Sequence, residues 1–159
     1  MWIQQLFLTN FRNYAKQELQ LPQGCTLVLG DNAQGKTNLL EAAFLLATAR
    51  SDRATTDGEL VRWEALGEAQ PVARVAAQVE RADGPLELEV IIVGRPKSSD
   101  VARVPASKRL RVNGVPRRQL DMVGQLTAVL FSTHDLELIG GPPAERRRFL
   151  DVTLSQIDA

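Results

Sequence analysis

The chain has 159 residues, of which 44% are hydrophobic and 24% charged, and its 19 basic residues balance 19 acidic ones. This is the composition of one globular domain with a sizeable core, and no apolar stretch reaches the roughly 18 residues of a membrane helix or has the layout of a signal peptide. A single cysteine, Cys25, excludes an internal disulfide and leads us to expect a reducing, cytoplasmic setting.

The first third of the chain predicts strands and one helix. Residues 2–10 and 14–21 are expected to form two strands. The short apolar run at 25–29 is expected to be a buried parallel strand, in which Cys25 would be a buried structural thiol. Residues 38–47 are a helix-forming run that is apolar on most of its faces, as in a buried helix.

Between that strand and that helix, the chain reads Gly-Asp-Asn-Ala-Gln-Gly-Lys-Thr, which matches the phosphate-binding pattern Gly-x-x-x-x-Gly-Lys-Thr. Gly30 and Gly35 can adopt positive φ, so the loop can curl into a cup of N–H groups at the positive end of the helix dipole. Lys36 is suited to the β- and γ-phosphates, and the Thr37 hydroxyl is suited to Mg²⁺. The sequence therefore predicts a nucleotide site formed by Gly30, Asp31, Asn32, Ala33, Gln34, Gly35, Lys36, Thr37 and Asn38.

The rest of the chain predicts mainly antiparallel strands and short helices. Alternating apolar residues predict strands over 72–81 and 86–93, and Asn113 and Gly114 predict the turn of a second hairpin. We therefore expect an α/β fold with a mixed sheet, in which antiparallel strands accompany the parallel core strand. The other expected elements are a loop at 50–58, a short helix at 59–64, a loop at 94–107, a helix at 119–126, a buried strand at 127–131, and a helix from Pro142 and Pro143 to about residue 156.

Basic residues gather in two segments. Residues 95–118 hold eight basic side chains against one acidic one, Asp100, and a second group lies at 146–148. Such groups can meet the phosphates of a nucleic acid, or they can be solvated surface with local salt bridges. The candidates for DNA contact are Lys108, Arg109, Arg111, Arg117, Arg118, Arg146, Arg147 and Arg148.

The residues before and after the phosphate-binding loop, together with a segment near the end of the chain, point to a family. Residues 8–14 read Leu-Thr-Asn-Phe-Arg-Asn-Tyr, and the loop continues as Thr-Asn-Leu-Leu-Glu-Ala. Residues 140–151 read Gly-Gly-Pro-Pro-Ala-Glu-Arg-Arg-Arg-Phe-Leu-Asp. Together they resemble the N-terminal part of the RecF family of DNA replication and recombinational repair ATPases, and the resemblance spans essentially the whole chain.

The resemblance implies part of an ATP-binding-cassette-type P-loop head, with an ATPase lobe over 1–150 and the start of a helical lobe over 151–159. RecF-like heads bind Mg-ATP and dimerise around it. They bind DNA in an ATP-dependent way during the response to DNA damage, and they assist RecO and RecR. Arg12 matches a position that reaches the nucleotide in this group; the alternative is a surface arginine on an edge strand.

This chain also departs from the RecF pattern. RecF proteins commonly have Pro-Glu where the chain has Thr133 and His134, so Ser132, His134 and Asp135 are only candidates for sensing metal and γ-phosphate. A Walker B strand with paired acids and a Ser-Gly-Gly signature are both absent from the sequence. We therefore expect poor or no ATP hydrolysis and no complete catalytic set, because phosphoryl transfer depends on such positioning. A missing core strand would also leave an open edge or an apolar face.

Two other interpretations belong to different classes of protein. The first is a small P-loop kinase or GTPase, although the guanine motif Asn-Lys-x-Asp is absent from the sequence. The second is a non-catalytic module that binds DNA or a protein and carries a relic phosphate loop.

Overall fold

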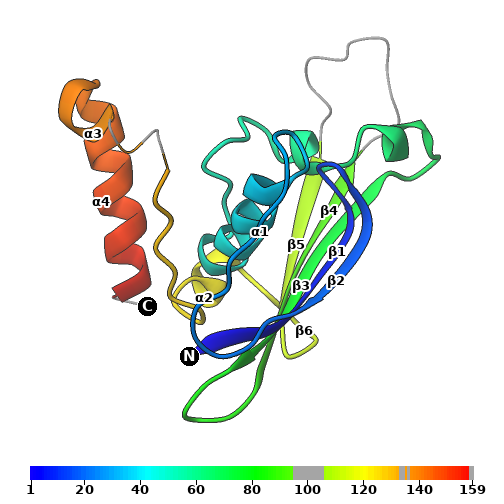
Figure 1. Ribbon diagram of the computed structural model, residues 1–159, viewed down its shortest axis with the longest axis horizontal. Coiled ribbons are helices and arrows are strands. Elements are labelled where there is room, and N and C mark those ends of the chain that lie inside the picture. The colour runs from blue at the N-terminus through cyan, green and yellow to red at the C-terminus, as the bar shows by residue number, and fades with distance from the viewer. Residues whose placement is uncertain (95–105, 133–134, 136, 158–159) are drawn as a thin grey trace.

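The computed structural model describes residues 1–94, 106–132, 135 and 137–157, without the side chains of Glu137 and Arg148 (Figure 1). Its centre is an antiparallel sheet in the order β2-β1-β3-β4-β5-β6. The strands are β1 (Trp2–Phe11), β2 (Tyr14–Gln20), β3 (Val72–Glu80), β4 (Leu86–Gly94), β5 (Ala106–Val112) and β6 (Val115–Arg117). The helices are α1 (Lys36–Thr48), α2 (Gln119–Met122), α3 (Glu137–Gly140) and α4 (Pro143–Ile157), with 3-10 turns η1 (Asp57–Leu60) and η2 (Glu64–Gly67).

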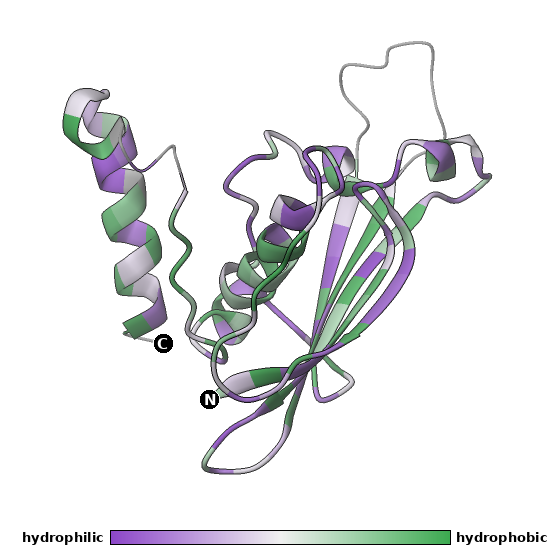
Figure 2. Ribbon diagram, viewed as in Figure 1, coloured by the Kyte–Doolittle hydropathy of each residue, from purple (hydrophilic) through white to green (hydrophobic). Residues whose placement is uncertain are grey.

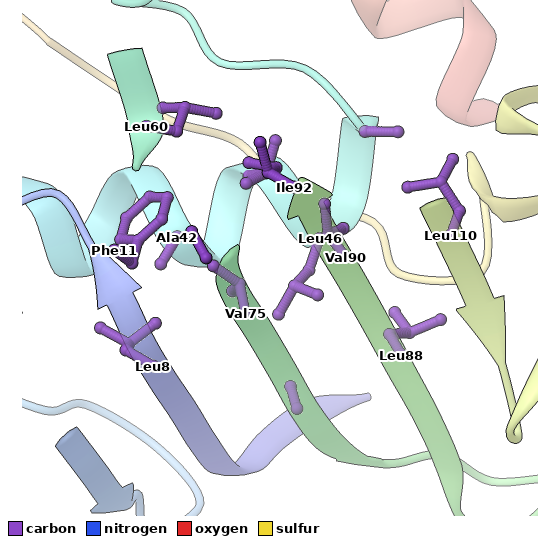
Figure 3. Packing of buried hydrophobic residues seen from close by; sticks show 14 of the residues in the cluster. Leu8, Phe11, Ala42, Leu46, Leu60, Val75, Leu88, Val90, Ile92 and Leu110 are labelled. Carbon is purple, nitrogen blue, oxygen red and sulfur yellow. The ribbon is translucent and has the colours of Figure 1, made fainter. Parts of the chain in front are cut away.

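Helix α1 lies across one face of the sheet and closes the hydrophobic core (Figure 3). Leu45 and Leu46 are fully buried, and Phe11, at the end of β1, is also fully buried. Figure 2 shows apolar residues concentrated on α1 and on the strands beneath it. The expectation of a buried helix is confirmed, and its packing fixes the start of α1 against the end of β1.

Both predicted hairpins are present. Val72–Glu80 pairs with Leu86–Gly94 in antiparallel register. The second hairpin turns at Asn113 and Gly114, whose φ values of 51° and 74° are both positive. Positive φ at both central residues is what a type I′ turn requires; this turn matches the twist of its strands, and Asn-Gly favours it.

The two predicted buried strands at 25–29 and 127–131 are not strands; neither segment has ladder pairing in the described part of the chain. Leu29 is 79% exposed and Phe131 is 81% exposed. Cys25 is also exposed, so the expectation of a buried thiol was wrong. A parallel strand is buried only when neighbouring strands pair with it, and no described strand pairs with either segment.

Smaller differences concern the helices. The helix expected over 119–126 ends at Met122, and the short helix expected over 59–64 is replaced by η1 and η2. Helix α4 begins at Pro143, as predicted, and runs without a break across residue 150, so the boundary between an ATPase lobe and a helical lobe stays a prediction. None of the described helices is long and apolar enough to span a membrane.

Candidate nucleotide-binding site

The glycine loop has the backbone that its sequence predicts. Gly30 and Gly35 have φ values of 150° and 98°, and Ala33 is also left-handed at 65°. Gly35 is the residue before α1, and its carbonyl accepts from the N–H of Asn38 at 2.8 Å. A Cβ on Gly35 would lie 2.5 Å from the Asn13 amide nitrogen, so any other residue would displace the Asn13 side chain and would also have to adopt a φ of 98°.

The Lys36 ammonium lies within the loop. Its Nζ donates to the carbonyls of Gly30 at 2.7 Å and Asp31 at 2.6 Å. Thr37 follows in the first turn of α1 with an exposed side chain. The loop therefore places a cation, a hydroxyl and the positive end of a helix dipole together, which is the donor set that a chain of phosphates with Mg²⁺ requires.

The donor set fits Mg²⁺ only in part. Thr37 offers one oxygen, and Mg²⁺ commonly completes its shell with waters and phosphate oxygens. The described residues contain no group of three His, Cys, Asp or Glu side chains that could hold a metal ion.

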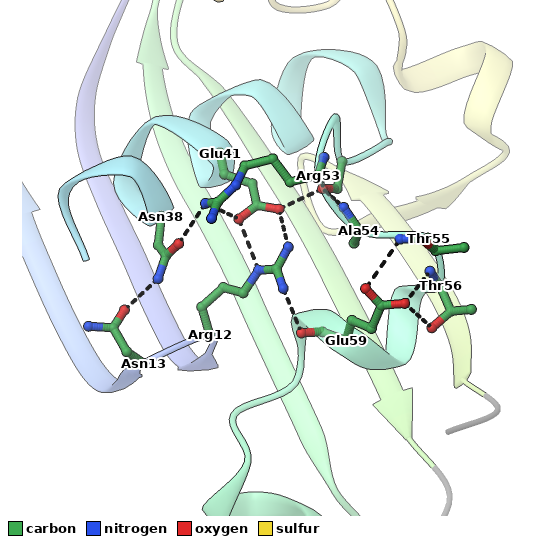
Figure 4. A network of polar contacts seen from close by, with 10 residues as sticks. Arg12, Asn13, Asn38, Glu41, Arg53, Ala54, Thr55, Thr56 and Glu59 are labelled. Carbon is green, nitrogen blue, oxygen red and sulfur yellow. Dashed lines mark hydrogen bonds and ion pairs between the residues drawn. The ribbon is translucent and has the colours of Figure 1, made fainter. Parts of the chain in front are cut away.

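Arg12 is turned toward a buried carboxylate. Its Nε and Nη2 donate to the two oxygens of Glu41 at 2.9 Å and 2.6 Å, and its Nη1 donates to the Glu59 carbonyl at 3.0 Å (Figure 4). The Glu41 side chain is 1% exposed. Arg12 thus joins the end of β1 to α1 and η1, and its contact with a nucleotide stays a prediction.

Two further side chains meet the same carboxylate. The Ser51 hydroxyl donates to Glu41 Oε1 at 2.5 Å and accepts the backbone N–H of Arg53 at 3.0 Å. The Arg53 Nη1 lies 3.5 Å from Glu41 Oε2. We call Arg12, Glu41, Ser51 and Arg53 the Glu41 network; burial of an ionised group is tolerated only with such pairing.

A chain of amide contacts links the Glu41 network to the loop. Arg53 Nη1 donates to Asn38 Oδ1 at 2.9 Å, and Asn38 Nδ2 donates to Asn13 Oδ1 at 2.8 Å. Asn13 Nδ2 donates to the Gln34 carbonyl at 3.2 Å. Sequence reasoning missed Asn13, Glu41 and Arg53 in these roles. The available signal was Glu41 itself, a charge inside an otherwise apolar helical run.

Glu59, whose backbone carbonyl accepts from Arg12, lies beside the Glu41 network. Slight burial raises the pKa of Glu59, but hydrogen bonds from Thr55 and Thr56 and the charge of Arg12 outweigh it, and the net pKa is below its ordinary value. A carboxylate with a lowered pKa stabilises the fold above its unfolded-state pKa, and that contribution is lost as pH falls through the folded-state pKa.

Comparison with known proteins identifies the family. Residues 5–88, more than half of the chain, match the family described as AAA domain. The chain belongs to the AAA domain family.

Relatives of this AAA domain chain carry the name "DNA replication and repair protein RecF". The protein from Chloroflexus aurantiacus is 52% identical and that from Chloroflexus aggregans 49% identical, each over 99% of this chain and 41% of the relative. The solved structure described as "Structure of the recombination mediator protein RecF-ATP in RecFOR pathway" matches with a TM-score of 0.80 and 34% identity, over 99% of this chain and 39% of that one. The chain thus spans about two fifths of the length of these relatives. The predicted resemblance to the N-terminal part of RecF, and the partial P-loop fold, are confirmed.

The basic residues in β5 that were predicted to contact DNA lie on both faces of the sheet. Lys108 faces the α1 side of the sheet and donates to Asp57 at 2.9 Å, whereas Arg109 and Arg111 face the opposite side. Arg111 is paired with Glu89, which Arg74 also contacts. Arg109, Arg117 and Arg118 are the exposed members around β5 and β6.

The second basic group lies on another element. Arg146, in α4, donates to the carbonyls of Leu138 at 3.2 Å and Gly141 at 3.1 Å, so it ties α4 to α3. Arg147 is exposed, and the side chain of Arg148 is outside the described part. The eight predicted DNA contacts therefore do not form one continuous surface of the described residues.

Of the candidates for sensing metal and γ-phosphate, Ser132 and Asp135 lie in the described part of the chain, and they line a cavity to which no residue of 30–38 contributes. The cavity has a volume of about 340 Å³ and lies between the end of α1 and α4, where Phe44, Phe149 and Val152 also line it. The backbone N–H of Ser132 donates to the Asp135 carboxylate. His134 lies outside the described residues. Contact of Ser132 or Asp135 with a nucleotide stays a prediction.

Proposed function

We propose that the chain is the ATP-binding N-terminal part of a RecF-type DNA repair protein, and that residues 30–38 bind Mg-ATP. The observation that carries this proposal is the position of Lys36, whose ammonium lies inside a left-handed glycine loop at the start of α1. The relative solved as RecF-ATP has the same fold over this region, which supports ATP as the nucleotide.

The first experiment replaces Lys36 by alanine. We expect affinity for a fluorescent ATP analogue with Mg²⁺ to fall roughly tenfold to a hundredfold, the loss typical of a charge-assisted contact to phosphate. Lys16→Ala is the matched control, because Lys16 is an exposed lysine on β2, and it should bind as the unsubstituted chain does. Equal binding by the two variants, or no binding at millimolar ATP, would exclude the site.

We further propose that this part of the protein contributes to DNA binding through Arg109, Arg117 and Arg118. They are exposed and lie around one hairpin, and the relatives are described as DNA replication and repair proteins. Arg111 is less suited, because its side chain is only 43% exposed and is paired with Glu89. Arg118 also lies 3.4 Å from Asp121, but its side chain is 89% exposed.

The second experiment measures duplex DNA binding against salt concentration. Each neutralised phosphate should contribute about −0.9 to the log–log slope. A triple variant with glutamate at Arg109, Arg117 and Arg118 should bind more weakly with a shallower slope, and Arg50→Glu, at an exposed arginine outside the candidates, should change neither as much. A flat salt response, or equal behaviour of the two variants, contradicts DNA contact at this hairpin.

We also propose that the protein of which this chain is a part behaves as other RecF-type proteins do. It would be cytoplasmic, dimerise around ATP, act in the DNA damage response, and work with RecO- and RecR-type mediators. Hydrolysis is proposed to require acidic and signature residues outside this sequence, because Lys36 and Thr37 supply only the phosphate-binding side of the reaction.

A further inference from the structure

We propose that Arg53 is a phosphate-contacting residue of this nucleotide site. The proposal rests on the proposed function, since it adds a second cation to the same site. Arg53 lies in the loop that follows α1. It belongs neither to the glycine-loop motif nor to the two basic segments, so the sequence alone did not predict a role for it.

The loop after α1 returns along the helix and brings Arg53 to its first turn. Arg53 Nη1 donates to Asn38 Oδ1 at 2.9 Å, and Asn38 directly follows Thr37 (Figure 4). Asn38 is in turn bound to Asn13, whose amide reaches the Gln34 carbonyl of the glycine loop. The Arg53 guanidinium is therefore held at the rim of the loop by two intervening amide side chains.

Arg53 has more unused donors than Arg12 and is more exposed. Each of the three nitrogens of the Arg12 guanidinium already donates one hydrogen bond, to Glu41 or to the Glu59 carbonyl, which leaves one N–H on Nη1 and one on Nη2, and its side chain is 19% exposed. Both side-chain contacts of Arg53 within the described residues go through Nη1, and its side chain is 39% exposed. Its Nε and Nη2 are left to donate, and a planar pair of N–H donors matches two phosphate oxygens.

The backbone of Arg53 is fixed, so the contact would be preorganised. The N–H groups of Arg53 and Ala54 both donate to the Ser51 hydroxyl, at 3.0 Å and 2.8 Å. Ser51 is bound to the buried carboxylate of Glu41, which α1 carries. An arginine held in this way loses less side-chain entropy on binding phosphate than a freely rotating one.

The test compares Arg53→Ala with Arg50→Ala in the 159-residue chain. Arg50 is exposed on the same loop and serves as the matched control. We expect Arg53→Ala to weaken Mg-ATP binding about tenfold or more, as for loss of a charged hydrogen bond, while Arg50→Ala changes it less than about twofold. Arg53→Lys keeps the charge without the paired donors and should lie between them.

Competition by inorganic tripolyphosphate separates a phosphate contact from a structural role. Arg53→Ala should weaken tripolyphosphate binding by the same factor as ATP binding, with a thermal midpoint close to that of Arg50→Ala. Two results would overturn the role of Arg53 and leave the proposed nucleotide site intact. One is tripolyphosphate binding by Arg53→Ala that equals that of the unsubstituted chain. The other is an ATP affinity of Arg53→Ala equal to that of Arg50→Ala while Lys36→Ala loses binding. If the unsubstituted chain fails to bind ATP, the proposed function fails and the inference fails with it.

Discussion

Replacing Glu41 by alanine should lower the free energy of unfolding by about 3 kcal/mol, because it leaves a largely buried arginine without its carboxylate. Glu41 accepts both guanidinium bonds of Arg12 and the hydroxyl of Ser51, and its side chain is 1% exposed. We take the lower end of the usual range since the 19% exposure of Arg12 lets water recover part of the loss. Urea unfolding followed by circular dichroism would measure the change.

Two comparisons make that result specific. Glu64→Ala removes a 63% exposed carboxylate from its pair with Arg62, and it should cost less than about 1 kcal/mol. In a Glu41→Ala background, Arg12→Ala should add little, because the two side chains act as one unit. Equal costs for Glu41→Ala and Glu64→Ala would mean that the network contributes no more than a surface ion pair.

Replacing Phe11 by alanine should lower the free energy of unfolding by about 4 kcal/mol, or roughly 8–16 °C in thermal midpoint for a chain of this size. Phe11 is fully buried against α1, near Ala42 and Leu60 (Figure 3). Removal of the ring leaves a cavity that the neighbouring backbone cannot close, because β1 and α1 are both held in place by other contacts. Calorimetry or fluorescence-detected melting would measure the shift.

Phe131→Ala is the matched control for Phe11→Ala. Phe131 is 81% exposed, so its loss should cost less than about 0.5 kcal/mol in this chain. A cost for Phe131→Ala close to that of Phe11→Ala would show that the segment at 127–131 is packed in solution, as its apolar sequence predicted.

The two substitutions with the largest expected effects, at Phe11 and Glu41, lie close together where the end of β1 meets α1. Phe11 precedes Arg12, so the core contact at the end of β1 also sets the position of the Glu41 network. Variants at Phe11 and Glu41 should therefore lose ATP affinity together with stability. Lys36→Ala should lose affinity alone, because the contacts of its ammonium with the described residues go to carbonyls of the exposed loop.

The sequence determined the features that depend on neighbouring residues. Gly30 and Gly35 take the left-handed conformations of the phosphate loop, and Asn113 and Gly114 take those of the hairpin turn. These conformations depend on local backbone sterics, which a few residues settle by themselves. The alternating strands and the helix that begins at Pro143 were predictable for the same reason.

Only the tertiary structure decided which distant groups meet. Arg12 and Glu41 are 29 positions apart, and Arg53 reaches Asn38 only because the loop after α1 turns back. A buried charge shows that partners must exist but not which ones they are. The apolar runs at 25–29 and 127–131 likewise indicated strands, but a strand needs a ladder partner, and no other described segment supplies one.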